Sequence, residues 1–112
     1  MLNLPLFVAI RRPSNLANFG TLLQSHLEWA VACEERGELF ASGPFTKDGA
    51  LPGAQGGMSI LRARDLAHAT EILGSDPFIS EGIYTATIEK WALMEGAINV
   101  QVTLSTQRVH FN

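Results

Sequence analysis

The sequence predicts one α+β domain in which two helices cover one face of an antiparallel sheet. Short apolar segments typical of strands flank two segments whose apolar residues recur with the helical period. Gly- and Pro-containing breaks separate the segments, so the expected order is strand, helix, strand, strand, helix, strand. A chain of 112 residues has the length of one domain of this kind.

The first strand and the first helix have the clearest patterns. Residues 4–11 are apolar and rich in β-formers, which predicts a buried strand that ends before Pro13. Residues 16–36 have the helical period, and Gly37 is the expected helix stop. One side of this helix is expected to face the core: Phe19, Leu23, His26, Leu27, Ala30 and Cys33.

The rest of the domain repeats this alternation. Strands are predicted over 38–45 and 56–62, joined by a long Gly-rich hairpin loop over 46–55. A short helix is predicted over 65–73 and a further strand over 83–91. The short helix is expected to turn four residues inward: Leu66, Ala69, Ile72 and Leu73.

The C-terminal tail extends this pattern. Residues 99–111 carry apolar residues at period two, which predicts an extra strand or strand-like arm that pairs with its own sheet or with that of a second copy. We therefore expect a domain over 1–95, with 96–112 as an arm of the same single domain. Two split βαβ units give a ferredoxin-like fold. Because two helices cover one face of its sheet, the other face predicts a homodimer.

The charge and composition exclude several classes of partner. The formal net charge is −3, and no basic run is longer than Arg11–Arg12, so a nucleic-acid partner is not expected. No apolar stretch approaches the ~20 residues that span a membrane, and the apolar N-terminal segment precedes its arginines, the reverse of a signal peptide. The single cysteine, Cys33, excludes an internal disulfide and is expected to be a buried thiol. The protein is expected to be cytoplasmic.

His26 is the most informative polar residue, because it lies at the centre of the apolar face of the long helix. A buried imidazole needs a hydrogen-bond partner. Two interpretations follow. His26 is a core histidine bonded to a backbone carbonyl, or it is a general acid or base in a pocket between helix and sheet.

Two other segments carry candidate site residues. Asp76 precedes Pro77, which is typical of a helix N-cap, and its second carboxylate oxygen is free to reach His26. At the end of the second strand, Ser42 is able to donate to a bound oxygen, and Gly43, followed by Pro44, leaves room for a ligand. The alternative there is a strand end that bends into the hairpin. No metal is expected, because the three histidines share no metal-ligand spacing. No organic cofactor is expected either, because the glycine run over 53–57 lacks the strand-then-helix context of a dinucleotide or phosphate loop.

Three motifs together resemble a known family. His26-Leu27-Glu28-Trp29, Ser42-Gly43-Pro44-Phe45 and Asp76-Pro77-Phe78, in this order, are similar to the YciI-like (YCII-related) family over roughly residues 4–91. The resemblance implies a dimeric α+β barrel of ferredoxin-like domains. It also implies that the histidine and the aspartate of these motifs form an active-site pair.

The chain departs from the family pattern at Leu22 and Leu23, where many members carry a basic residue. The resemblance therefore does not carry an anionic substrate to that position. The tail after Gly96 also lies outside the family pattern.

Three functions remain open from the sequence. The first is a cofactor-free enzyme that performs isomerisation, lactone opening or dehydrohalogenation on a small cyclic or aromatic metabolite. In that enzyme His26 is the base, Asp76 orients it, and Ser42 or a nearby backbone N–H stabilises the developing oxyanion. The second is a non-catalytic dimer that binds a small ligand or serves as an accessory module. The third is a purely structural dimerisation domain.

Overall fold

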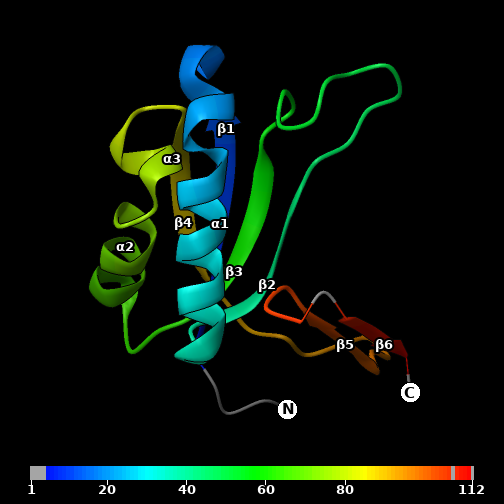
Figure 1. The fold of residues 1–112 in the computed structure, drawn as a ribbon. Helices are drawn as coiled ribbons and strands as arrows, with labels where there is room; N and C mark the ends of the chain where they lie inside the picture. Colours follow the sequence, from blue (N-terminus) through cyan, green and yellow to red (C-terminus); the bar gives the residue numbers. More distant parts are fainter. Residues whose placement is uncertain (1–4, 107, 112) are drawn as a thin grey trace.

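The computed structural model describes residues 5–106 and 108–111. A four-stranded antiparallel sheet in the order β2-β3-β1-β4 carries helices on one face (Figure 1). This is the predicted α+β, ferredoxin-like arrangement, which is confirmed. Its elements are β1 (Leu6–Pro13), α1 (Phe19–Glu35), β2 (Leu39–Pro44), β3 (Gly57–Arg62), α2 (Leu66–Gly74), α3 (Pro77–Ser80) and β4 (Tyr84–Trp91).

The alternation of side chains along β1 divides the sheet into two faces. Phe7 and Ala9 pack under the helices, together with Leu61 of β3. Arg11 continues the same face, and Ser59 lies directly opposite Ala9 in the β1–β3 register. One end of the helix-covered face is therefore polar although the rest is apolar.

The long helix differs in detail from the prediction. It begins at Phe19, after a 3-10 turn over Leu16–Asn18. Leu23 was expected to face the core but is 37% exposed, so that expectation is wrong. The buried side of α1 instead includes Trp29. The indole N–H of Trp29 donates to the carbonyl of Ile72 (3.2 Å) and to Ser75 Oγ (3.0 Å). These contacts join α1 to the end of α2.

On α2, Leu66 is 51% exposed, and its predicted burial is also wrong.

The tail forms its own small sheet. The single strand predicted over 99–111 is wrong, because β5 (Val100–Thr103) and β6 (Arg108–Phe111) pair with each other in an antiparallel hairpin. Figure 1 shows this hairpin apart from the main sheet. Its turn is held at the C-terminal end of α1, where Glu34 accepts hydrogen bonds from the backbone N–H groups of Leu104 and Ser105.

Figure 1 shows the described helices on one face of the main sheet, and apolar side chains lie on the other face. Val8 and Ile10 are half-buried there, and Met58, opposite Ile10, is 37% exposed. Trp91, at the end of β4, is 40% exposed. We call Val8, Ile10, Met58 and Trp91 the open sheet face. None of the helices within the described residues is long and apolar enough to cross a membrane.

Candidate functional site

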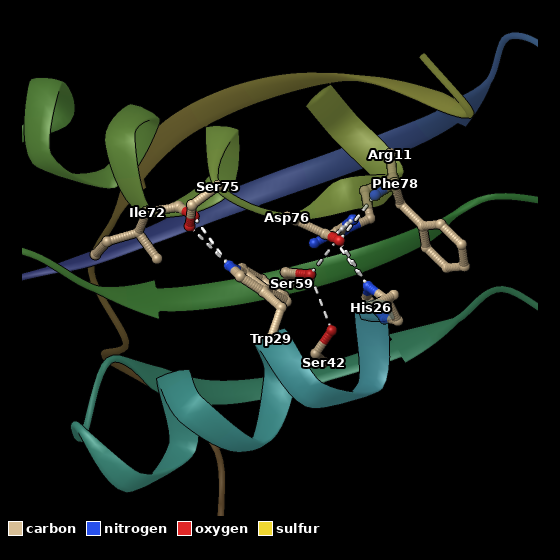
Figure 2. A network of polar contacts seen from close by, with 9 residues as sticks. All are labelled: Arg11, His26, Trp29, Ser42, Ser59, Ile72, Ser75, Asp76 and Phe78. Carbon is tan, nitrogen blue, oxygen red and sulfur yellow. Dashed lines mark hydrogen bonds and ion pairs between the residues drawn. The ribbon is translucent and has the colours of Figure 1, made fainter. Parts of the chain in front are cut away.

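His26 of α1 and Asp76, just before α3, form a hydrogen-bonded pair (Figure 2). Nδ1 of His26 lies 2.9 Å from one carboxylate oxygen and 3.0 Å from the other. Asp76 is fully buried, and the side chain of His26 is 18% exposed. The fold thus brings together two predicted site residues that are 50 positions apart.

Asp76 is also the N-cap of α3. Its Oδ1 accepts a hydrogen bond from the backbone N–H of Phe78 at 3.0 Å, and Pro77 occupies the first turn. The two roles considered for this carboxylate from the sequence therefore occur together. The cap fixes the position of the carboxylate, so His26 meets a rigid partner.

Arg11 of β1 completes this buried polar cluster. Its Nη1 donates to Asp76 Oδ2 at 2.5 Å, and its Nε donates to Ser59 Oγ at 3.0 Å. The guanidinium carbon lies 5.4 Å from the centre of the Trp29 ring, and Arg11 is only 6% exposed. The sequence interpretation missed this residue. The signal was its period-two spacing from Phe7 and Ala9, which turns it toward the helices.

The surroundings of Asp76 keep its carboxylate ionised. Burial by itself would raise the pKa of Asp76, but the hydrogen bond from His26 and the charge of Arg11 hold that pKa below its usual value. An ionised carboxylate accepts the Nδ1 proton of a neutral imidazole, so Nε2 is left as the acceptor nitrogen. Within the described residues, Nε2 makes no hydrogen bond and is not buried, so it is open to solvent.

Ser42 lies at the other end of the same network (Figure 2). Its Oγ is 2.9 Å from Ser59 Oγ. Ser59 is fully buried and already accepts from Arg11, so its own hydroxyl proton is best satisfied by Ser42. The proton of the exposed Ser42 hydroxyl is then free for another acceptor.

Gly43 and Pro44 continue β2 beyond Ser42, and both are exposed. They pair with Met58 and Gly57 of β3. No hydrogen bond in the described part of the chain joins either of them to His26 or Asp76. A Cβ on Gly43 would meet no atom within 4 Å, so this position faces open space.

Aromatic rings flank the imidazole. The His26 ring stacks on Phe78 with centroids 4.3 Å apart, and the Trp29 ring lies at 5.6 Å. Phe78 in turn stacks on Phe19 at 5.0 Å. The hydroxyl of Tyr84 packs beside them and donates to the carbonyl of Gly53 at 2.6 Å, which ties the long hairpin loop to this cluster. The imidazole of His26 is therefore surrounded mainly by aromatic, apolar rings.

Two cavities, of about 410 and 250 Å³, lie at the C-terminal end of α1. Neither is lined by His26, Asp76 or Ser42. The His26–Asp76 pair therefore lies outside both of these cavities. Among residues 5–106 and 108–111, no group of three or more His, Cys, Asp or Glu side chains is placed to hold a metal ion.

Cys33 is fully buried, as predicted. Burial is the main cause that raises the pKa of its thiol to about 11. The thiol therefore stays protonated near neutral pH and is a poor nucleophile.

Comparison with known proteins identifies the family and the fold. No curated protein matches the chain. A solved structure of similar fold is a 5-chloro-2-hydroxyhydroquinone dehydrochlorinase from Burkholderia phenoliruptrix AC1100 in complex with 2,5-dihydroxybenzoquinone. The two share 17% sequence identity with a TM-score of 0.59, over 78% of this chain and 93% of that one. The family model of the YCII-related domain matches residues 5–92. The chain therefore belongs to the YCII-related domain family, as its three motifs predicted.

Proposed function

We propose that the chain is a cofactor-free enzyme that transfers a proton on a small cyclic or aromatic metabolite. The observation that carries the proposal is the hydrogen bond between His26 Nδ1 and the buried carboxylate of Asp76. This bond orients the imidazole with Nε2 outward, which is the arrangement that a general base requires. Asp76 orients the base and takes no proton itself.

In the proposed reaction, Nε2 of His26 removes a proton from the substrate. The electron pair left behind delocalises onto a substrate oxygen, and the free hydroxyl proton of Ser42 stabilises that oxyanion. In an isomerisation the proton returns to a different atom of the substrate. In an elimination the electron pair forms a double bond, and a halide leaves with its own bonding pair. In lactone opening the base instead takes the proton of an attacking water.

The walls of the site favour a planar, oxygenated substrate. Phe78 and Trp29 are buried and pack against the imidazole, so the surroundings of His26 are aromatic and apolar. Exposed Gly43 and Pro44 extend the edge beyond Ser42 as a substrate-binding rim. The dehydrochlorinase of similar fold is named for a chlorinated hydroquinone and binds a hydroxylated benzoquinone. We therefore place halogenated or hydroxylated quinols first among the candidates.

We further propose that the enzyme is a cytoplasmic homodimer. Two observations support the dimer: the open sheet face is apolar and partly exposed, and none of the described helices covers it. Pairing of two such faces buries them without another element. Residues 96–112 then act as an arm of the same domain, held to α1 through Glu34.

A turnover screen with a catalytic variant tests the proposed chemistry. The full-length protein is incubated with hydroxylated aromatic compounds, including 5-chloro-2-hydroxyhydroquinone, and released halide and product mass are followed. We expect His26→Gln to lower kcat/KM by about 10²- to 10⁴-fold with an unchanged circular dichroism spectrum. Gln24→Ala, on the exposed side of the same helix, is the control and should keep full activity. Equal turnover by His26→Gln would exclude His26 as the base.

A second candidate function is non-catalytic binding of the same class of ligand. The position of His26 outside both described cavities favours it, because catalysis gains from the exclusion of water. In that case a compound binds with saturation and is recovered unchanged by mass spectrometry after long incubation.

A further inference from the structure

We infer that the chain has a second binding site, which takes the oxyanion group (phosphate or carboxylate) of a small molecule. The site is the shallow, open depression of about 410 Å³ at the C-terminal end of α1, which we call the arginine cavity. Arg36 follows His26 by ten positions, or about 15 Å along the helix axis, so this cavity is separate from the His26–Asp76 pair. Its polar lining consists of Arg36, Glu38, Arg62, Arg64 and His68.

The lining is strongly cationic for this protein. The chain has 8 basic and 11 acidic residues, and three of the basic ones line this single cavity against one glutamate. Guanidinium groups match carboxylate and phosphate oxygens with paired donors. Although the protein is acidic overall, the lining of this cavity therefore carries a net positive charge, which attracts anions.

Two of the arginines are held in place by the chain itself. Arg62 Nη1 donates to the carbonyls of Gly37 (3.2 Å) and Leu39 (3.4 Å), and its guanidinium carbon lies 5.1 Å from the centre of the Phe40 ring. Arg36 Nε donates to Glu38 at 2.7 Å. Arg36 Nη2 donates to Cys33 Sγ at 3.4 Å, and the Arg36 side chain as a whole is 52% exposed, so a ligand is able to reach its guanidinium edge. A ligand would thus find donors that are already ordered.

His68 adds an oriented donor. Its Nδ1 accepts a hydrogen bond from the backbone N–H of Arg64 at 3.1 Å, so the proton of a neutral imidazole lies on Nε2. Nε2 lies 3.7 Å from Glu38 Oε2, beyond direct hydrogen-bond distance. The side chain is 16% exposed, so a ligand oxygen in the cavity is able to reach this N–H.

The negative groups nearby are either satisfied or placed to one side. The last carbonyls of α1, on Ala32, Cys33 and Glu34, accept hydrogen bonds from the backbone N–H groups of residues 36–38. Their partial negative charge therefore repels a bound anion less. Glu38 lines both cavities, but its carboxylate accepts a hydrogen bond from Arg36 and lies 3.7 Å from His68 Nε2, whereas Glu71 lines only the adjoining cavity of about 250 Å³. We therefore place the bound oxyanion beside Arg62 and Arg64.

An NMR titration of the full-length protein tests this site, with inorganic phosphate in one arm and acetate in the other at constant ionic strength. We expect saturable shifts of the backbone amides of Gly37, Arg64 and His68 with at least one anion. The anion that saturates at the lower concentration identifies the group. Arg64→Gln should weaken that affinity about tenfold, because a charge-assisted hydrogen bond is lost.

Arg12→Gln is the matched control, since Arg12 is exposed on β1 and lines neither cavity. Its affinity should equal that of the wild type. The inference is overturned if both anions give only the linear shifts that chloride gives, or if Arg64→Gln binds as tightly as the wild type. Stability measurements on Arg64→Gln separate a lost ligand contact from a damaged fold.

Discussion

At the scale of single residues, the site depends on Asp76. Its carboxylate serves Arg11, His26 and the N–H of Phe78 at once, from a fully buried position. A buried charge is tolerated when it is paired and hydrogen-bonded. The same three partners also fix the orientation of the Asp76 carboxylate. They therefore stabilise the fold and orient the imidazole of His26 at the same time.

Removal of the buried cation should therefore be costly. Arg11→Met leaves the carboxylate of Asp76 without its charged partner, and we expect a loss of about 3 kcal/mol in the free energy of unfolding. Urea denaturation measures it. Arg12→Met is the matched control, because Arg12 is exposed, and it should change stability by less than about 0.5 kcal/mol. Equal stabilities of the two variants would show that the Arg11–Asp76 pair contributes nothing.

The lowered pKa of Asp76 predicts a particular pH dependence. A carboxyl group whose pKa falls on folding stabilises the protein above its unfolded value, here the ordinary 3.8, and this stabilisation is lost as pH falls through the folded value. The difference in unfolding free energy between wild type and Asp76→Asn should thus be constant at neutral pH and shrink in acid below 3.8.

Asp48→Asn, in the exposed hairpin loop, is the control for that measurement and should show no such acid-dependent difference. A carbon NMR titration of the Asp76 carboxyl in the wild type reports the same pKa directly. A midpoint at or above the ordinary value would contradict the account of its hydrogen bonds.

The sequence predicted part of this residue network. Helical spacing placed His26 inward, and the Asp-Pro pattern marked Asp76 as a cap with a spare oxygen. Arg11 and Ser59 were missed because they are 48 positions apart and meet only through the register of β1 with β3. Local patterns do not contain that register, although the spacing of Arg11 from Phe7 and Ala9 was a usable signal.

At the scale of elements, the long hairpin loop is fastened to the aromatic cluster at one point. Gly53 has φ of +83°, and a Cβ there would lie 2.4 Å from the Phe19 ring and 2.8 Å from the Tyr84 hydroxyl. The loop therefore approaches the rings so closely that glycine alone fits. This contact joins the loop to Phe19 and Tyr84, which pack against Phe78 in the same aromatic cluster.

Gly53→Ala should consequently release the loop. We expect it to cost about 1–3 kcal/mol more in unfolding free energy than Gly49→Ala, because overlap with the rings is added to the backbone strain. Gly49 is the matched control: it lies in the same loop with φ of +81°, and a Cβ there would meet no atom within 4 Å. Equal losses in urea denaturation would show that the ring contact is unimportant.

The sequence predicts helices and strands well where one period of apolar residues persists through a segment, and less well elsewhere. The strands and helices of the sheet domain followed from their periods and from the Gly and Pro breaks. The alternation of residues in the tail predicts one strand, because a period of two does not reveal the turn around Ser105. The helical period predicts that Leu23 and Leu66 face inward, because it defines an apolar stripe but not which part of the stripe is covered. In the structure, Trp29 of α1 is buried and bonds to the end of α2, whereas Leu23 and Leu66 are partly exposed.

At the scale of the whole molecule, the open sheet face predicts self-association. Sedimentation should give about twice the mass of one chain at micromolar concentration. We expect Met58→Glu to shift this to one chain without loss of secondary structure, because Met58 is 37% exposed and a charge there opposes face-to-face packing. Met94→Glu, 63% exposed outside the main sheet, is the control and should leave the mass unchanged. A wild type of one-chain mass would exclude the dimer.

Base catalysis by His26 depends on which nitrogen of its imidazole carries the proton. Long-range nitrogen–proton NMR of the imidazole at mildly alkaline pH measures this without any substrate. We predict a proton on Nδ1, shared with Asp76, and an unprotonated Nε2 open to solvent, with this preference lost in Asp76→Asn. A proton on Nε2 with a bare Nδ1 would contradict the proposed base and remove the physical ground for catalysis by His26.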